Sequence, residues 1–256
     1  MLAFSRPVSD FMSSPVHTIG VDASVDEAAA RRSELHVSSR RADPADGRAA
    51  GVLPRTDRLQ RAGGRVGDQM SQPVVSAEVS DSVAVAARTM LERRIHRVYV
   101  LSAGRALGVL STREVMLAVR ESRIDTPLSA MMSSPVIAID FDRPAAEASA
   151  LLDSESIGGV VVVENDHPVG MYTQREALAA RDLPADTRVE DAMSPALMCL
   201  RTTVPAHRAA AFTVSTRART IVVTHHHDMK GVVSGMDFVR LVATGTDPSA
   251  ERARVG

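Results

Sequence analysis

Cysteine and aromatic residues are scarce in this chain of 256 residues, which contains no Trp, five Phe, two Tyr and one cysteine. A single cysteine excludes an intrachain disulfide and makes a zinc site built from cysteines untenable. Cys199 lies in an apolar run at residues 197–200, and we expect it to be a packed strand residue. The scarcity of aromatic rings also argues against binding sites that depend on aromatic stacking.

Long hydrophobic runs and a strong net charge are missing as well. No apolar run approaches the length of a membrane helix, and residues 1–10 lack the apolar segment of a signal peptide. The formal charge of -1 argues against a nucleic-acid-binding or acidic-membrane-binding surface. We therefore expect a reduced, cytoplasmic protein without nucleic-acid or membrane partners. Its hydrophobic content of 45% is enough for a sizeable core.

A short motif recurs four times: a Gly, two apolar residues, a Ser or Thr, and a carboxylate three positions later. We call this motif the corner, because it is typical of a buried strand running into the first turn of a helix. A hydroxyl there caps the helix, and a carboxylate in the first turn suits the helix dipole. Exposed backbone N–H groups at such a turn also favour anions. The four corners span residues 51–57, 108–114, 170–176 and 231–237, the first with Pro54 in place of the hydroxyl.

A second motif precedes each corner, a Met followed by Ser and, two or three residues after the Met, by Pro. We call it the marker. The markers begin at Met12, Met70, Met132 and Met193, and each Met lies 38 or 39 residues before the Gly of its corner. Two motifs at a fixed offset, four times over, indicate an internal repeat of about 60 residues. We expect the marker Met residues to fill gaps at an interface between domains.

Each repeat has the pattern β-α-β-β-α, which predicts an α/β (α+β) fold. In the second repeat we expect strands at 74–77, 97–101 and 106–110 and helices at 82–93 and 112–120. The continuous apolar run at 157–163 predicts a strand covered on both faces. One unit of this size has a small core, so the repeats should pair.

The first repeat departs from this pattern. Its first helix should begin at the capping box of residues 24–27. Where the other repeats have apolar triplets in the second strand, the first repeat has Arg41, Ala42 and Asp43, followed by Pro44. Charges and a Pro are unfavourable in a buried strand. We therefore expect this strand to be missing, irregular or poorly ordered.

Polar, Pro-containing stretches set the expected boundaries. We predict a first module at 8–120, with repeats one (8–62) and two (66–120), and a second module at 127–244, with repeats three (127–181) and four (188–244). The polar stretch at 120–127 should separate the modules, and the tail at 245–256 should be disordered.

These residues resemble a known family. The β-α-β-β-α unit, the Met-x-x-Pro start, the entry into the second strand at 95–100 and the Gly-h-h-Ser/Thr-x-x-Asp/Glu corner look like the cystathionine β-synthase (CBS) domain over residues 8–244. The resemblance implies two Bateman modules whose clefts bind AMP, ADP, ATP or S-adenosylmethionine as a regulatory ligand, with no other cofactor required. It also implies adenine-nucleotide or energy sensing and an effect on a separate, regulated protein. It leaves a homodimer open.

The resemblance also implies binding residues. The corner hydroxyl and helix N-terminus would meet phosphate, the corner carboxylate would meet ribose, and aliphatic strand residues would hold adenine. The pair His96 and Arg97 resembles a phosphate-binding pair in the gamma subunit of AMP-activated protein kinase. Arg219 takes the position of His96 in repeat four, and repeat three has Gly158 and Gly159 there. The predicted ligand-binding residues are His96, Arg97, Ser111, Glu114, Thr173, Glu176, Arg219, Thr220, Ile221, Val232, Ser234 and Asp237.

Helix capping is the simpler explanation of each corner. Glu114 and Glu176 have the reach to bond back to the N-cap backbone, so a structural role is favoured for both. Asp is one methylene shorter, and Asp237 should therefore be freer for a ligand. Asp57 lacks the hydroxyl before it, which disfavours a site in repeat one.

The sequence also bears on an enzymatic, a metal-binding and a scaffolding function. The chain has no nucleophile elbow and no Walker loop, so we do not expect an enzyme. The run His225-His226-His227-Asp228 could suggest a metal-dependent enzyme, but it falls in a turn between strands, where adjacent side chains point opposite ways. The principal alternative to a ligand sensor is a ligand-free scaffold for protein interactions. A panel of adenosine compounds in a thermal-shift assay would separate the two.

Overall fold

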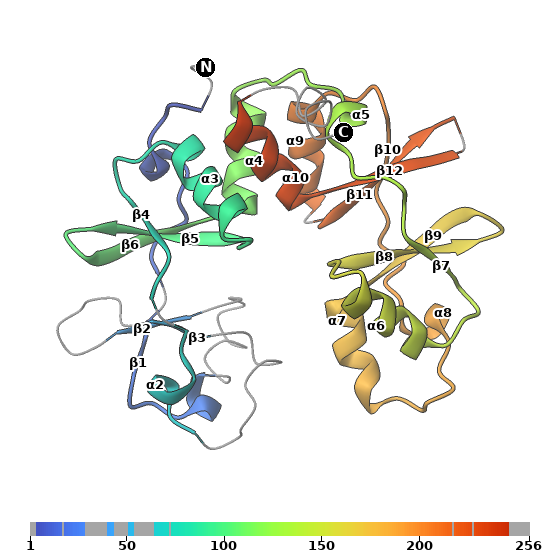
Figure 1. Ribbon diagram of the computed structural model, residues 1–256, viewed down its shortest axis with the longest axis horizontal. Helices are drawn as coiled ribbons and strands as arrows, with labels where there is room; N and C mark the ends of the chain where they lie inside the picture. The colour runs from blue at the N-terminus through green and yellow to red at the C-terminus, as the bar shows by residue number, and fades with distance from the viewer. Residues whose placement is uncertain are drawn as a thin grey trace. The chain divides into compact units, whose positions relative to one another are not determined.

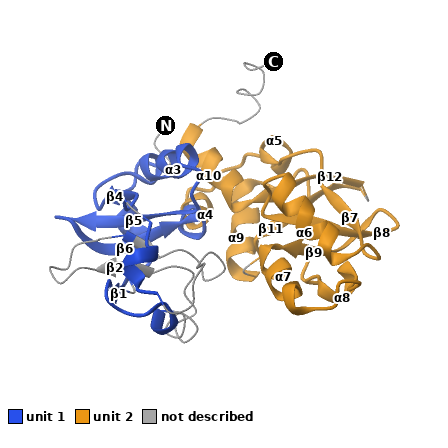
Figure 2. Ribbon diagram, turned by 60° about the horizontal axis from the view of Figure 1, so that its bottom comes forward, with its two compact units in different colours: residues 1–115 blue, residues 116–256 orange. Residues whose placement is uncertain are grey.

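The structure is a computed structural model, and it describes residues 4–16, 18–28, 40–43, 51–53, 64–71, 73–216, 218–226 and 228–245. The backbone divides into two compact units, residues 1–115 and 116–256 (Figure 2). The predictions for Pro44, Pro54, Asp57 and the tail beyond Gly245 lie outside the described residues. The module limits of 8–120 and 127–244 stay predictions.

Unit 1 contains the elements of the first two repeats (Figure 1). They are η1 (Val8–Asp10), β1 (Thr18–Gly20), β2 (Arg40–Asp43), β3 (Gly51–Leu53), α2 (Val66–Gln69), β4 (Ser76–Glu78), α3 (Val83–Glu92), β5 (Arg97–Ser102) and β6 (Arg105–Ser111). Helix α4 (Thr112–Glu121) continues from β6 across the boundary between the units. The elements expected in repeat two are all present, within one or two residues at most ends.

Unit 2 contains the elements of repeats three and four. They are α5 (Leu128–Met131), β7 (Ala138–Asp140), α6 (Ala145–Ser154), β8 (Gly159–Glu164), β9 (His167–Thr173), α7 (Gln174–Ala179), η3 (Ala180–Asp182), α8 (Val189–Ala192), β10 (Cys199–Arg201), α9 (Ala206–Thr216), β11 (Thr220–His225), β12 (Asp228–Ser234) and α10 (Gly235–Thr244). Gly245 ends α10 in the left-handed conformation, with φ of 60°.

Every repeat forms a sheet of three strands in the order first, second, third. In repeats two to four the first two strands run parallel because a helical crossover joins them, whereas the second and third form an antiparallel hairpin with a short turn. The hairpin turn of repeat two uses Ala103 and Gly104, both with positive φ. The predicted β-α-β-β-α fold is confirmed.

The prediction of a missing second strand in repeat one is wrong. β2 is present, paired parallel with β1 and antiparallel with β3. A strand ladder uses the N–H and C=O groups that every residue except Pro provides, so Arg41 and Asp43 do not prevent it. Repeat one nevertheless has a small described core, in which Ile19, Ala28 and Val66 are buried together.

Repeat three has a larger core, and β8 shows why its sequence is continuously apolar. Val160 and Val162 are buried against α6 and Tyr172, whereas Val161 and Val163 are buried on the other face. That second face packs with Val222 of β11 in repeat four. The predicted burial of this strand on both faces is therefore confirmed. Cys199 lies in the predicted strand, β10, but it is exposed, so its predicted packing is wrong. The side chains of this short strand alternate between its two faces, and Cys199 lies on the exposed one.

The marker of each repeat packs on the sheet of the other repeat in its unit. A Cβ atom at Gly108 would lie 2.5 Å from Sδ of Met12, and one at Gly231 would lie 2.7 Å from Sδ of Met132. The same holds for Gly51 with Met70 and for Gly170 with Met193. These glycines are therefore required by close approach of a neighbouring segment. The markers are exchanged within each unit, and the Met residues fill the interface between repeats.

Candidate functional site

In repeats two, three and four, each corner lies beside the start of the second strand of its own repeat. The backbone N–H of Thr112 donates to the carbonyl oxygen of His96 at 3.1 Å, and the strand register pairs Arg97 with Ser111. In the same way Gly159 pairs with Thr173. The antiparallel hairpin thus brings together residues that are 14 or 16 positions apart in sequence.

The same register places the predicted residues of repeat four. Thr220 pairs with Ser234, and Ile221 with Val233. Ile221 is fully buried, whereas Val232 is half-buried and forms a bridge with Ser133 of the exchanged marker. Arg219 is exposed just before the strand. The predicted residues of each repeat therefore cluster around its own corner.

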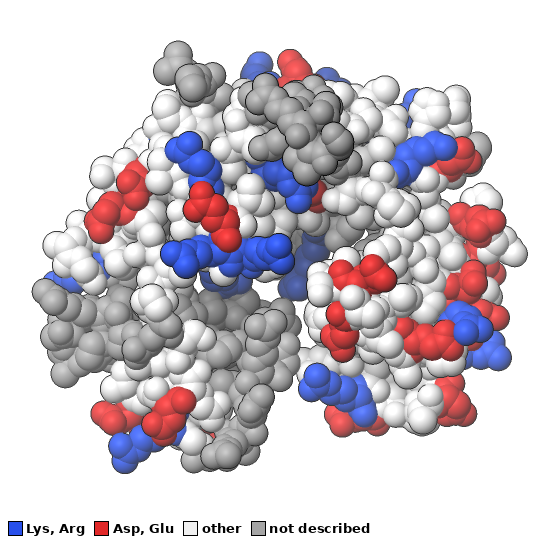
Figure 3. Space-filling model, viewed as in Figure 1, with Lys and Arg blue, Asp and Glu red and all other residues white. Residues whose placement is uncertain are grey.

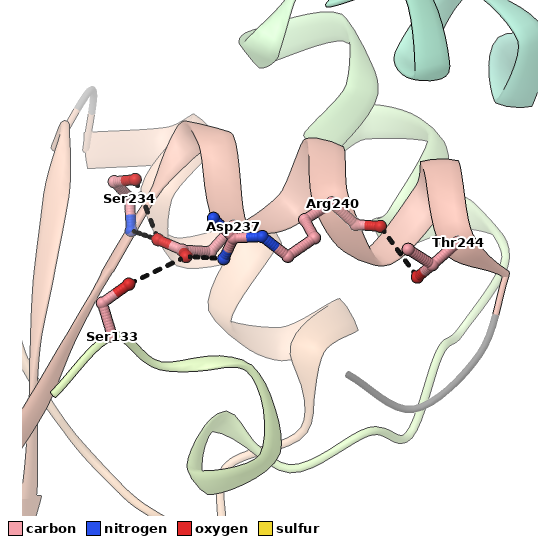
Figure 4. Close-up of polar contacts among 5 residues, drawn as sticks. All are labelled: Ser133, Ser234, Asp237, Arg240 and Thr244. Carbon is pink, nitrogen blue, oxygen red and sulfur yellow. Dashed lines mark hydrogen bonds and ion pairs between the residues drawn. The ribbon is translucent and has the colours of Figure 1, made fainter. Parts of the chain in front are cut away.

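Asp237 completes a capping box, so the expectation that it stays free of the cap is wrong (Figure 4). Its Oδ2 accepts hydrogen bonds from the backbone N–H and the hydroxyl of Ser234, both at 2.8 Å. The N-cap residue turns both donors toward the carboxylate, which compensates for the shorter Asp side chain. Its Oδ1 accepts from Arg240 Nη1 at 2.8 Å and from Ser133 Oγ at 3.3 Å. A carboxylate has about four acceptor positions, and here four donors fill them.

Burial reinforces this arrangement. Asp237 is only 4% exposed, so an unpaired charge there would be strongly unfavourable. Arg240 lies one helical turn further along α10 and supplies the compensating cation. The role of this corner in the structure is to join α10, β12 and the marker of repeat three.

Glu114 caps α4, as predicted. Its Oε2 accepts from the backbone N–H of Ser111 at 2.8 Å and from the Ser111 hydroxyl. Its Oε1 accepts from Ser13 Oγ at 2.7 Å, and the residue is 5% exposed. Ser13 belongs to the exchanged marker of repeat one, so this carboxylate also joins two repeats.

Glu176 caps α7, as predicted, but only one of its oxygens is used. Oε2 accepts from the backbone N–H of Thr173 at 3.1 Å and from the Thr173 hydroxyl. Among the residues described, none donates a hydrogen bond to Oε1. The side chain is half-buried. The corner of repeat three therefore presents a carboxylate oxygen that is open to a further donor.

The marker serines are site residues that the sequence analysis missed. In each corner carboxylate, we call the oxygen that bonds to the local helix cap the inner oxygen and the other the outer oxygen. Ser13 and Ser133 each donate to the outer oxygen of a corner carboxylate in the paired repeat. A signal was present in the sequence, because a Ser follows the Met in all four markers. Its partner was not evident, because the exchange places the Ser and the carboxylate about one hundred residues apart along the chain.

Electrostatics differ between the repeats. Desolvation by the surrounding protein, followed by the charge of Arg97, lowers the pKa of His96. Residues 128–195 contain twelve acidic residues and four Arg, and all of the acidic residues except Glu176 are exposed. Red side chains accordingly gather over the part of the molecule occupied by repeat three (Figure 3). Two of its four Arg residues, Arg143 and Arg188, form ion pairs with nearby Glu residues.

The histidine run lies at the hairpin turn of repeat four. His225 ends β11, His226 has φ of 54°, and Asp228 begins β12. This confirms the predicted location in a turn. In the described part of the chain, no three His, Cys, Asp or Glu side chains are grouped to hold a metal ion. Over the same residues, every helix is too short or too polar to cross a membrane.

The family model described as the CBS domain matches residues 64–121 and 128–182, which are repeats two and three. The chain is a CBS-domain protein. Its four sheets of identical strand order and its four exchanged markers show that repeats one and four of this CBS-domain protein are built in the same way.

Solved structures share this fold. A conserved protein from Pyrococcus horikoshii has a TM-score of 0.73 at 17% identity, with 92% of this chain and 99% of that one covered. A protein from Methanocaldococcus jannaschii, described as a proposed archaeal homologue of g-AMPK, has a TM-score of 0.74 at 12% identity, with 91% and 99% covered. At these identities the likeness concerns the fold alone.

A curated sequence is also similar. An uncharacterised 33.4 kDa protein in a ribosomal RNA operon of Thermofilum pendens is 30% identical over 127 residues, which is 44% of this chain and 42% of that protein. The chain thus matches less than half the length of this relative.

Proposed function

We propose that this CBS-domain protein is a regulatory sensor that binds an adenosine-containing ligand at the corners of its paired repeats and signals to a separate protein. The observation that carries the proposal is the corner of repeat three. There the outer oxygen of Glu176 accepts no hydrogen bond from the described residues, although the inner oxygen completes the cap. An ionised carboxylate is an acceptor only, and the vicinal hydroxyls of a ribose are suitable donors.

The space beside this corner also supports a ligand site in repeat three. A Cβ atom at Gly158 would meet no atom within 4 Å, and the neighbouring Gly159 pairs directly with Thr173. Repeat two has His96 and Arg97 at these positions, and repeat four has Arg219 and Thr220. A Cβ atom at Gly159, by contrast, would lie 3.1 Å from Cγ2 of Thr173. The room in repeat three is therefore at Gly158, where repeat two carries His96 and repeat four carries Arg219.

The charge of each repeat favours some of the candidate ligands over others. The excess of acidic over basic residues in repeat three disfavours a ligand that carries several phosphates and favours a neutral or cationic adenosine compound. S-adenosylmethionine, with its sulfonium group, fits repeat three better than ATP does. Arg97 beside Ser111 gives repeat two a cation of the kind that a phosphate such as that of AMP requires, and His96 adds a neutral imidazole that can form hydrogen bonds.

Calorimetric titration with S-adenosylmethionine, AMP, ADP and ATP tests this proposal. Glu176→Gln should weaken S-adenosylmethionine binding by roughly one to two orders of magnitude, the range for losing one hydrogen bond to a charged group. The Gln carbonyl oxygen can still serve the cap, which leaves an NH₂ donor in place of the outer acceptor. Thermal unfolding of the variant checks that the fold is retained.

The matched control is Glu114→Gln, in a corner whose outer oxygen already accepts from Ser13. It should leave S-adenosylmethionine binding unchanged. Equal losses in both variants, or no binding of any of the four compounds to the wild type, would contradict the proposal. The second outcome would favour the ligand-free scaffold, a role that the filled carboxylate of Asp237 already favours for repeat four.

A further inference from the structure

The three described corners differ in how many donors their carboxylates receive. Asp237 accepts from four donor groups, Glu114 from three and Glu176 from two. In each case two donors are the N–H and hydroxyl of the local cap. The difference lies in the outer oxygen, which is occupied in repeats two and four and open in repeat three.

One residue type accounts for the closed corners. Ser13 donates to Glu114 at 2.7 Å, and Ser133 donates to Asp237 at 3.3 Å. Both are the second residue of an exchanged marker, and both bridge to the paired repeat. The type of carboxylate is not decisive, because one closed corner has Glu and the other has Asp.

The marker that faces repeat three has a different spacing. Ser194 is followed directly by Pro195, whereas one residue separates the Ser from the Pro in the markers of Ser13 and Ser133. The Ser194 hydroxyl instead accepts from the backbone N–H of Ala196 at 3.3 Å, a local side-chain turn. The backbone of Ser194 still pairs with Met171, so the segment is docked while its hydroxyl is turned to its own chain.

We propose that the marker serine is a gate that decides which corners accept a ligand. Where its hydroxyl reaches the paired repeat, it occupies the outer carboxylate oxygen and closes the corner. Where Pro follows at once, the hydroxyl turns away and the corner is open. The ligand-binding half of this inference rests on the proposed function, but the closing contact itself does not. Arg240 gives repeat four a second closing group. In repeat two, Ser13 is the one described residue that donates to the outer oxygen, so the gate can be tested there.

The first test needs no ligand. Carbodiimide coupling to glycinamide, followed by peptide mass spectrometry, compares the reactivity of the corner carboxylates in the intact chain. In the wild type, Glu176 should react and Glu114 should be protected. Ser13→Ala should raise the labelling of Glu114 several-fold, whereas Ser194→Ala, the matched control, should leave Glu176 unchanged. Unchanged labelling of Glu114 in a folded Ser13→Ala protein would overturn the gate, whatever the ligand experiments show.

The second test uses AMP in calorimetric titration, because His96 and Arg97 adjoin the corner that Ser13 closes. Ser13→Ala should tighten AMP binding roughly tenfold, as expected for one new hydrogen bond to a charged group, and Glu114→Gln added to it should abolish the gain. Weaker or unchanged AMP binding to a Ser13→Ala protein that melts like the wild type would overturn the gate for ligands. If labelling rises but no protein binds any adenosine compound, the contact is verified and the proposed function fails.

Discussion

The corners of repeats three and four have nearly the same sequence pattern, but their carboxylates differ in how many hydrogen-bond donors they receive. Repeat four has the complete Gly-h-h-Ser-x-x-Asp motif, and its carboxylate is filled by four donors and is 4% exposed. Repeat three has Glu in place of Asp and two glycines, Gly158 and Gly159, at the strand start, yet no described residue donates to its outer oxygen. A complete motif therefore measures how well the helix is capped. It does not measure whether the carboxylate is available to a ligand.

The largest expected effect is on stability, from Asp237→Ala. The change leaves Ser234 without its partner and Arg240 without its counter-ion, beside a site that is almost fully buried. Losing one side of such a network destabilises by about 2–4 kcal/mol. Urea unfolding monitored by circular dichroism measures the change. Glu176→Ala, which removes only a cap, should lose about 1 kcal/mol. Equal losses would remove the distinction between the two corners.

Gly231→Ala should have the next largest effect. A Cβ atom there would lie 2.7 Å from both Sδ of Met132 and the carbonyl oxygen of Ser133. Backbone cannot yield as a flexible side chain can, so we expect a loss of about 1–3 kcal/mol. Gly158→Ala is the control, because its Cβ would meet nothing within 4 Å, and its unfolding free energy should change by no more than about 0.5 kcal/mol. A neutral Gly231→Ala would argue against close docking of the marker.

The smallest expected effect comes from His96, which occupies in repeat two the position of Gly158 in repeat three. Its lowered pKa means that the folded protein binds a proton less readily than the unfolded chain. The associated stability is present above about pH 6.5 and is lost as the pH falls toward the folded pKa. Wild type should therefore lose slightly more stability than His96→Gln between pH 7.5 and 5.5, as measured by urea unfolding at each pH. A larger loss of unfolding free energy in His96→Gln than in the wild type would contradict the lowered pKa of His96.

Sequence reasoning succeeded wherever the interactions are local. Hydroxyl caps, hairpin turns and alternation of buried residues act over a few positions, so the elements of repeat two and the two-sided burial of β8 were predictable. The prediction for β2 failed because strand pairing depends on backbone N–H and C=O groups, whereas the prediction was based on the absence of apolar side chains. The prediction for Cys199 failed because an apolar run does not show which face of a short strand is covered.

The sequence by itself determined that four similar units exist and, in repeat two, where the strands and helices begin to within two residues. Only the tertiary structure decided which repeat each marker packs on, and so which carboxylate each marker serine reaches. The reason is physical. Capping is a contact between residues three positions apart, whereas Ser13 with Glu114 and Ser133 with Asp237 are separated by 101 and 104 residues. These contacts arise only when paired repeats exchange segments, and a single residue between Ser and Pro then separates a closed corner from an open one.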